Sequence, residues 1–313
     1  MTSGKNVWAI ASALAVLFCG SVSQADQPLK PATPLLDTGL AAPIPEKLVL
    51  SDDGASRLTI PVMVNGQGPF PFIIDTGADR TVISKELAAA LNLPAGPHVS
   101  MHESAGVDDV QTAVIARLDV GKRTVEHIDA PLLAAADLGA MGMLGIDSLR
   151  DQHVVMDFKV NEMSSSPSHV EAFDPNLIVV HGRSRFGQLV LVDAIVRGVR
   201  VWVILDSGAQ SSVGNMALRK LLTRNDVQHA QYPATEVISV TGRRTPAEMQ
   251  DIGETHIGDL TIFHMPLAFA ELHTFDRFGL ADKPAMLLGM DVLRTCQRVT
   301  VDFKRREATF KTR

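Results

Sequence analysis

The stretch FIIDTGADRTVIS, residues 72–84, decides how the rest of the chain is interpreted. A similar stretch, VILDSGAQSSVGN, occupies residues 203–215. The two align with Asp75 opposite Asp206, an offset of 131 residues (206 − 75). The tripeptide Asp-Thr/Ser-Gly alone is a weak signal because chance supplies it easily. Its meaning depends on whether the surrounding sequence repeats as well.

A two-strand pattern leads into each of the two aspartates. In the first half LTIPVMV (58–64) and FPFIID (70–75) flank a turn that contains Gly. In the second half QLVLVDAIV (188–196) and VRVWVILD (199–206) do the same. Apolar, β-branched runs around such a turn predict β-hairpins.

A predicted helix follows each aspartate. Ser84 and Asn215, nine residues after the aspartate of their own copy, are N-cap candidates. Their side chains can accept hydrogen bonds from the free N–H groups at the start of a helix. The short helical patterns KELAAALNL (85–93) and MALRKLL (216–222) come next.

The match continues to the end of each half. LDVGKRTVEHI (118–128) aligns with THIGDLTIFHM (255–265), and MLGIDSLRDQHVVMDFK (143–159) aligns with LLGMDVLRTCQRVTVDFK (287–304). Ordered matches across a whole half-chain indicate an internal duplication.

Four titratable residues correspond between these later blocks. Asp147 and Asp291 precede helix-like segments, which favours a role as N-caps over a role as additional catalytic acids. His127 and His264 correspond as well, and we interpret them as turn or packing residues rather than catalysts.

The duplication predicts two homologous β-rich lobes, residues 48–162 and 176–313. A polar linker at residues 163–175 joins them. Two such lobes place equivalent residues across an approximate two-fold axis. Asp75 should therefore face Asp206, and the active site should lie between the lobes.

Two facing carboxylates can hydrolyse an amide without a metal or a covalent nucleophile. Because both cannot ionise cheaply at close range, they share one proton and titrate as a pair. The ionised member takes a proton from a water held between them, while the protonated member polarises the carbonyl. The hydroxyls of Thr76 and Ser207 could hydrogen-bond across the lobe interface and fix the spacing of the pair.

Residues 1–25 have the pattern of a secretory signal peptide. Lys5 precedes an apolar run at residues 7–19, and small residues at 23–25 precede Asp26. The alternative is an uncleaved membrane anchor, but the run is shorter than the roughly 20 residues that a spanning helix needs. We therefore expect a periplasmic or secreted protein, with no membrane span once the signal is removed.

The segment that follows, residues 26–47, is rich in proline and is expected to be an extended tail or a pro-segment. It contains a third Asp-Thr-Gly at Asp37. No hairpin pattern leads into Asp37 and no capped helix follows it, so we do not interpret it as a site. Beyond the signal, Cys296 is the only cysteine, which excludes an internal disulfide.

The composition limits the partners. The chain has 313 residues and a net charge of −6 without large charge blocks, whereas nucleic acid binding calls for a basic surface. The ten histidines show no HExxH or close ligand spacing, so we expect no metal and no cofactor. Duplicated lobes in one chain predict a monomer that is an internal pseudo-dimer.

With these residues in view, FIIDTGADRTVIS resembles the active-site loop of retropepsin-like aspartic proteases, and VILDSGAQSSV resembles the same loop. LLGMDVLR, within residues 287–304, is similar to the segment that braces this loop in retropepsins and pepsins. The resemblance is to a bacterial, exported, duplicated form with a pepsin-like arrangement. It implies an all-β fold of two retropepsin-type, β-barrel-like lobes with short helices, and Asp75 and Asp206 as the catalytic pair. It assigns supporting roles in the loops to Thr76, Gly77, Ala78, Ser207, Gly208 and Ala209.

The sequence departs from the family pattern in its substrate-binding and flap regions. Gln210 stands where the first lobe has Asp79, a position that binds substrate backbone in the retroviral family, so the two halves of the cleft should be unequal. The only tyrosine, Tyr232, precedes Gly242 by ten residues, so no pepsin-type flap tyrosine is recognisable. The flap candidates are polar stretches at residues 101–110 and 237–246, with Gly106 and Gly242 near their tips.

Ala78 and Ala209 occupy positions where pepsins commonly carry a hydroxyl residue. A hydroxyl can donate to the catalytic carboxylate and favour its charged form, and alanine cannot. We therefore expect a higher upper pKa for the pair than in pepsin, and activity in mildly acidic to near-neutral conditions.

The prediction from the sequence is an aspartic endopeptidase that takes an extended peptide or protein substrate between its lobes. The alternative is a catalytically weak peptide-binding module on the same scaffold. The intact Asp-Ser-Gly of the second lobe favours the enzyme, because Ser keeps the hydroxyl that Thr supplies in the first lobe.

Overall fold

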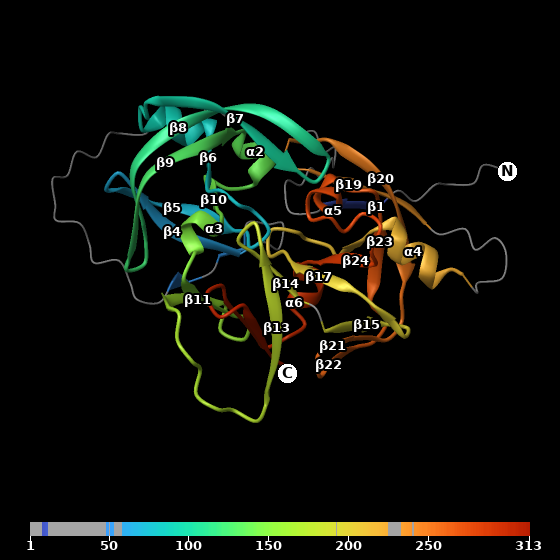
Figure 1. The fold of residues 1–313 in the computed structure, drawn as a ribbon. Helices are drawn as coiled ribbons and strands as arrows, with labels where there is room; N and C mark the ends of the chain where they lie inside the picture. The colour runs from blue at the N-terminus through green and yellow to red at the C-terminus, as the bar shows by residue number, and fades with distance from the viewer. Residues whose placement is uncertain are drawn as a thin grey trace, which may run out of the picture.

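The structure is a computed structural model. It describes the strands β1 (Trp8–Ala11), β2 (Leu48–Val49) and β3 (Ser51–Asp52), and residues 58–191, 193–224, 233–239 and 241–313. The chain is mostly β and forms two barrel-like lobes, as predicted (Figure 1). β1, within the predicted signal, pairs in parallel with β19. The rest of the predicted signal, the Pro-rich tail with Asp37, and Tyr232 lie outside the described residues.

The first lobe is built around a six-stranded barrel. Its strands pair in the order β4-β5-β10-β6-β9-β8, and the pairing of β4 with β8 closes the ring. The bounds of these strands are β4 Leu58–Val64, β5 Gln67–Ile74, β10 Gly142–Leu144, β6 Val82–Ser84, β9 Arg123–Leu133 and β8 Gly106–Val120. β7 (Ala95–Glu103) forms a long hairpin with β8. The lobe also carries the helices α1 (Lys85–Ala90), α2 (Ala135–Leu138) and α3 (Ile146–Leu149).

The second lobe repeats the strand order of the first. The order β14-β17-β24-β18-β23-β20-β19 corresponds to β4-β5-β10-β6-β9-β8-β7. These strands are β14 Gln188–Leu191, β17 Trp202–Leu205, β24 Ala285–Leu288, β18 Val213–Gly214, β23 Pro266–Phe269, β20 Arg244–Asp251 and β19 Ala234–Ile238. A separate sheet holds β16 (Val199–Arg200), β15 (Ala194–Val196), β21 (Thr255–Ile257) and β22 (Leu260–Ile262). The helices of this lobe are α4 (Met216–Leu222), α5 (His273–Arg277) and α6 (Met290–Leu293).

A shared sheet joins the lobes beneath the site. β11 (Gln152–Asp157) and β12 (Glu162–Pro167) of the first half lie beside β25 (Arg298–Asp302) and β26 (Glu307–Lys311) of the second, with β13 (Leu177–Arg185) on the far side of β26. β11 and β25 are equivalent segments of the duplication, and they pair antiparallel across the two-fold axis. This pairing fixes the two lobes against each other, and a largely aliphatic core runs through both.

The predicted local structure at the start of each lobe is confirmed. Both hairpins form, and the N-cap side chains of Ser84 and Asn215 accept from Leu87 N at 3.0 Å and Leu218 N at 2.9 Å. No helix among the described residues is long and apolar enough to cross a membrane.

Candidate active site

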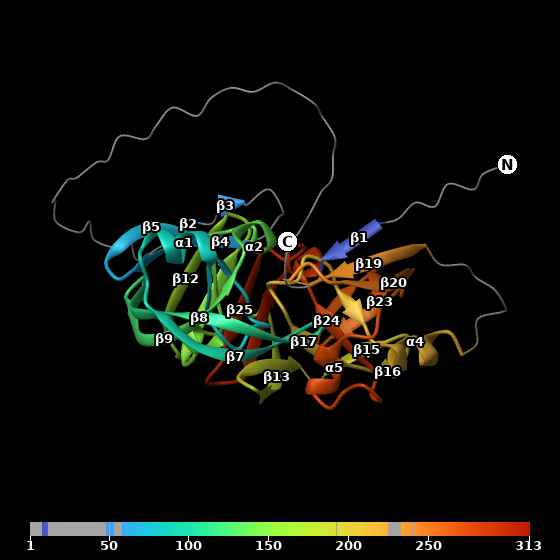
Figure 2. The same cartoon turned by 90° about the horizontal axis from the view of Figure 1, so that it is seen from above.

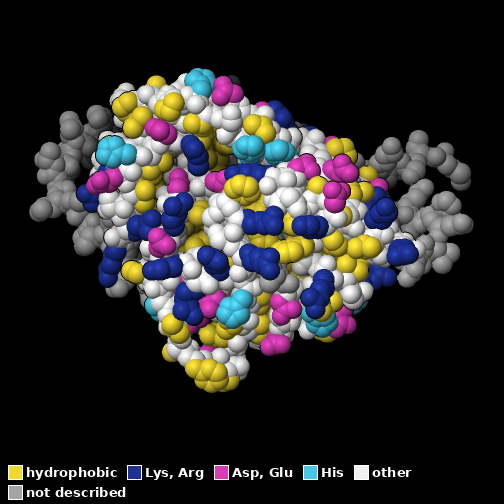
Figure 3. All heavy atoms as spheres, viewed as in Figure 1, with side chains coloured by type: hydrophobic (Ala, Val, Ile, Leu, Met, Phe, Trp, Pro, Cys, Tyr) yellow, Lys and Arg dark blue, Asp and Glu magenta, His cyan; other side chains and the backbone are white. Residues whose placement is uncertain are grey.

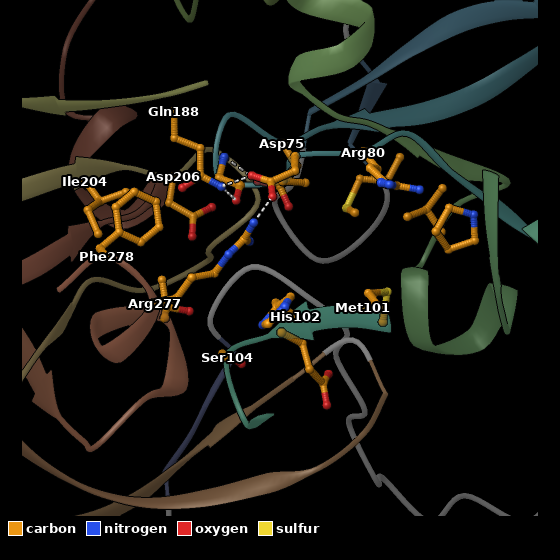
Figure 4. Close-up of a pocket in the computed structure, with 18 of the residues that line it drawn as sticks. Asp75, Arg80, Met101, His102, Ser104, Gln188, Ile204, Asp206, Arg277 and Phe278 are labelled. Carbon is orange, nitrogen blue, oxygen red and sulfur yellow. Dashed lines mark hydrogen bonds and ion pairs between the residues drawn. The ribbon is translucent and has the colours of Figure 1, made fainter. Parts of the chain in front are cut away.

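Asp75 and Asp206 lie where β5 and β17 end, at the interface of the lobes (Figure 4). Both are buried, with 1% and 4% of their surface exposed. The Asp75 carboxylate accepts from Gly77 N at 2.7 Å, and Asp206 Oδ1 accepts from Gly208 N at 3.1 Å and Ala209 N at 3.0 Å. The structure thus brings together the two residues predicted to form the pair, in matching loops.

Each carboxyl group lies against the glycine of the opposite loop. A Cβ atom on Gly77 would collide with the Asp206 carboxyl, and one on Gly208 would collide with the Asp75 carboxyl. Glycine is therefore required at both positions because only a residue without a side chain permits this approach. The reciprocal contact shows that the two loops cross the interface symmetrically.

The hydroxyls of Thr76 and Ser207 hydrogen-bond across the lobe interface, as expected from the sequence. Thr76 Oγ1 donates to the Leu205 carbonyl at 3.0 Å and accepts from Ser207 N at 3.0 Å. Ser207 Oγ donates to the Ile74 carbonyl at 3.0 Å and accepts from Thr76 N at 3.1 Å. All four bonds are buried, so they hold the two loops in a fixed register at the base of the pair.

The environment of the pair raises the pKa of both carboxyl groups. Burial raises the pKa of Asp75 well above its usual range, and the neighbouring Asp206 charge raises it further. Burial likewise raises the pKa of Asp206, to about 6. Asp75 Oδ2 has no hydrogen-bond partner among the described residues. The pair can therefore keep one proton between its members up to mildly acidic pH and beyond.

The interpretation of Asp147 and Asp291 as N-caps is wrong. The N-caps of α3 and α6 are Gly145 and Gly289, and neither makes a side-chain cap. The Asp147 carboxylate instead accepts from Thr81 N at 2.9 Å and from Thr81 Oγ1 at 2.7 Å. These bonds tie α3 to the first active-site loop.

The second lobe has the same brace. Asp291 accepts from Ser212 N at 2.9 Å and from Ser212 Oγ at 2.7 Å. Thr81 and Ser212 are themselves related by the offset of 131 residues (212 − 81). Conserving a hydroxyl in both copies at this offset is the signal by which the brace could have been found.

The two equivalent histidines lie on the surface of their lobes. His127 and His264 both have positive φ angles, of 56° and 51°, and both are exposed. His264 lies in a bend after β22, as expected of a turn residue, whereas His127 lies within β9.

One hairpin of each lobe lies at a position predicted for a flap. We name β7–β8, with Gly106 next to its tip, the first flap, and β19–β20, with Gly242 in its turn, the second flap. Residues 99–103 of β7 line the cavity that holds the pair. Thr241 Oγ1 lies 2.7 and 2.8 Å from the two carboxylate oxygens of Glu103, and Arg243 pairs with Asp108. These contacts connect the tips of the two hairpins to each other.

The cleft is unequal at its two ends, as the exchange of Asp79 for Gln210 predicts. Asp79 lines the cavity, where it is paired with Arg277 and accepts from Gln188 Nε2 at 3.2 Å. Gln188 Nε2 also donates to the Gly77 carbonyl. Gln210 does not line the cavity. Gln188 and Arg277 of the second lobe thus bind the polar groups of the active-site loop of the first lobe.

These cavity residues of the second lobe were missed from the sequence. Arg277 belongs to a segment of fifteen residues (270–284) between β23 and β24, where the first lobe has eight (134–141) between β9 and β10. The longer segment carries α5, which also contacts the first flap: His273 N donates to the Ser104 carbonyl at 2.8 Å (Figure 2). The difference in length was the available signal.

No cluster of three or more His, Cys, Asp or Glu side chains with the geometry of a metal site occurs in the part of the chain that the structure describes. At the centre of the site are the two carboxyls and the N–H groups of Gly77, Gly208 and Ala209 that bind them. This arrangement suits acid–base chemistry on a bound water.

Comparison with known families finds two matches in tandem. Residues 60–151 match the family described as "gag-polyprotein putative aspartyl protease", and residues 192–292 match the family described as "Aspartyl protease". Each match contains one Asp-Thr/Ser-Gly loop and the segment that braces it. No curated protein matches the chain.

Proposed function

The chain belongs to the retropepsin-like aspartic proteases and carries two aspartyl protease domains in tandem, and from this premise we propose that it is an endopeptidase in which Asp75 and Asp206 activate a water molecule. The observation that carries the proposal is the position of the two carboxyls. Both are buried, each lies against the glycine of the opposite loop, and the Asp206 charge adds to burial in raising the pKa of Asp75. Structural aspartates seldom meet in this way, because two buried carboxyls repel when both are ionised.

The pair supplies both the base and the acid of the reaction. With one proton shared, the ionised carboxyl removes a proton from the bound water as its oxygen attacks the scissile carbonyl carbon. The protonated carboxyl gives its proton to the carbonyl oxygen, which forms a neutral tetrahedral intermediate. The proton taken from the water then passes to the leaving nitrogen. As the C–N bond breaks, one hydroxyl of the intermediate becomes the new carbonyl and returns its proton to the other carboxylate, so the pair again holds one proton.

The backbone of the two loops orients the carboxyls for this exchange. N–H groups of Gly77, Gly208 and Ala209 hold one oxygen of each aspartate, which leaves the other oxygens for the shared proton and the water. The Thr76–Ser207 bonds fix the distance between the loops. The geometry is therefore set before substrate binds, so little reorganisation is needed during the reaction.

We also propose that the substrate is an extended stretch of polypeptide bound beneath the flaps. Edges of β-hairpins can pair with an extended peptide through main-chain hydrogen bonds. Since the flap tips are connected, entry of a polypeptide requires them to separate. The duplicated lobes supply both aspartates from one chain, so the active form is a monomer, and the signal-like residues 1–25 direct it to the periplasm or outside the cell.

The test is cleavage of a mixed peptide library, followed by mass spectrometry, with and without pepstatin. Wild type should cleave, and pepstatin, Asp75→Asn and Asp206→Asn should each abolish cleavage. Asp37→Asn is the matched control because it makes the same change in the third Asp-Thr-Gly. If wild type and the Asp75 and Asp206 variants behave alike, the enzyme proposal is wrong. Binding of library peptides without cleavage would favour a peptide-binding module.

A further inference from the structure

Arg80 is a cation at the cleft that the proposed reaction does not use. It lines the same cavity as Asp75, its side chain is exposed, and it forms no ion pair with any described residue (Figure 4). The other guanidinium group of the cavity wall, that of Arg277, is paired with Asp79. Burial lowers the pKa of His102, which disfavours its cationic form, and its ring is hydrogen-bonded to His273 at 3.0 Å.

The backbone of Arg80 is held rigidly. Ile146 N donates to the Ala78 carbonyl at 2.8 Å, and Asp147 accepts from Thr81 N at 2.9 Å, so the brace holds the residues on both sides of it. Gly145 packs directly against the Arg80 backbone and leaves no room for a Cβ atom. The guanidinium therefore projects from a fixed point, which lowers the entropic cost of binding an anion there.

The charge is present in one lobe only. The residue related to Arg80 by the offset of 131 is Ser211 (80 + 131), which is neutral and does not line the cavity. A peptide across the cleft would therefore meet a cation without an ion-pair partner on the first-lobe side of the pair, whereas Arg277 of the second lobe is already paired with Asp79.

Apolar side chains line the same cavity as Arg80. They include those of Val82, Met101, Pro131 and Met143. A substrate side chain that fits there needs an apolar stem for these walls and an anionic end for the guanidinium. Glutamate has both, whereas aspartate has a shorter stem.

An anion in the cavity also has to overcome the charge of the Asp75–Asp206 pair. With one proton shared, the pair carries a negative charge that repels a second carboxylate nearby. Arg80 is the one cation of the described cavity wall that is free to compensate it. At longer range, the face in Figure 3 carries a band of Lys and Arg side chains across its middle, which attracts acidic segments.

We propose that Arg80 makes the cleft select peptides that place a glutamate side chain in the pocket between Asp75 and Arg80. The inference rests on the proposed peptidase function, of which it names the substrate class. Because the guanidinium is partly exposed to water, its preference for Glu over Gln should be modest, about two- to fivefold in kcat/KM.

The test uses a peptide cleaved by the wild type, with Glu, Gln, Asp or Lys placed in turn at each position around the scissile bond. At one position the wild type should prefer Glu over Gln, and the preference should weaken as salt is added. Arg80→Ser, which installs the residue of the second lobe, should bring the Glu/Gln ratio to one. Arg80→Glu should favour Lys over Glu. Lys220→Glu, the same charge change on the exposed face of α4, should leave the ratio as in the wild type.

A Glu/Gln ratio that is the same in wild type and Arg80→Ser at every position overturns the inference, while cleavage of the Gln peptide leaves the proposed function intact. If no peptide is cleaved, the proposed function fails and the inference is decided by binding. Fluorescence anisotropy of labelled Glu and Gln peptides should then show the same preference, which Arg80→Ser should remove. Equal binding of the two peptides by the wild type overturns the inference.

Discussion

The hydroxyl of Thr241, at the tip of the second flap, lies within 2.8 Å of both carboxylate oxygens of Glu103, at the tip of the first. Glu103 is buried, and burial raises the pKa of its carboxyl. Arg243 lies 3.7 Å from the same carboxyl group and pairs with Asp108. The contact couples hairpins that belong to different lobes, so the opening of the cleft depends on a small set of polar groups.

Glu103→Ala should loosen the flaps, because it removes the acceptor for Thr241 and a charge near Arg243. Loss of a buried, charge-assisted contact costs about 1–3 kcal/mol, so amide hydrogen exchange at the flap tips should speed up by about tenfold or more. Exchange in residues 99–107 and 238–247 is the measurement. Glu236→Ala is the control, because Glu236 pairs with Arg244 within the second flap alone. Equal exchange in the two variants would contradict the prediction.

Thr76→Val should reduce kcat with little effect on folding of the lobes. The variant keeps the shape of the side chain but loses the hydroxyl that bonds Leu205 and Ser207 across the interface. A displacement of the pair by a fraction of an ångström to an ångström can cost on the order of a hundredfold in rate. Thr76→Ser is the matched control, since serine already serves at position 207, and it should retain most activity. The measurement is kcat of the two variants from steady-state kinetics. A Thr76→Val enzyme as active as Thr76→Ser would show that the hydroxyl is dispensable.

The duplication made most of the candidate site predictable from sequence. A repeat at a constant offset indicates which residues face each other, so Asp75, Asp206, Thr76 and Ser207 could be paired before any coordinates were known. The same logic places the N-caps of α1 and α4. Each of these features is local to a lobe or follows from the two-fold relation.

The contacts that break the two-fold relation could not be predicted from the repeat alone. Gln188 and Arg277 of the second lobe bind the active-site loop of the first lobe. The first lobe has no equivalent residues from which these contacts could be predicted. Asp147 was misinterpreted for a different reason. Aspartate just before a helical pattern is often the N-cap residue. Here Gly145 is the N-cap, and the Asp147 carboxylate accepts a hydrogen bond from Thr81 instead. Spacing along one segment cannot show a partner 66 residues away.

The rate of hydrolysis should peak in mildly acidic to near-neutral solution. Activity needs one protonated and one ionised carboxyl, so it falls at low pH as the base is protonated and at high pH as the acid ionises. Burial raises the pKa of Asp206 to about 6 and that of Asp75 well above its usual range, which moves both limits upward. A profile of kcat/KM against pH is the measurement. A maximum near pH 2–3, in the range of a low-pKa pair, would refute the prediction.

Stability should depend on pH through the same pair. The pKa of Asp206 is raised from 3.8 to about 6 on folding, so the folded state binds the proton more tightly than the unfolded state. This contribution to stability is fully present below the unfolded pKa near 3.8 and is lost as the pH rises through about 6. Between pH 5 and pH 7 the pair should therefore lower the free energy of unfolding by on the order of 1–2 kcal/mol.

Asp75→Asn/Asp206→Asn isolates this contribution, because the double variant keeps the shape of both side chains and cannot titrate. Its free energy of unfolding should exceed that of the wild type at pH 7, and the difference should shrink as the pH falls to 5. Urea unfolding at several pH values measures both proteins under identical conditions. Other titrating groups act equally on both and cancel in the difference. If the free energies of unfolding of the two proteins change in parallel across this pH range, the pair has the same protonation in the folded and unfolded states. That result would contradict the proposal that the folded pair shares a proton.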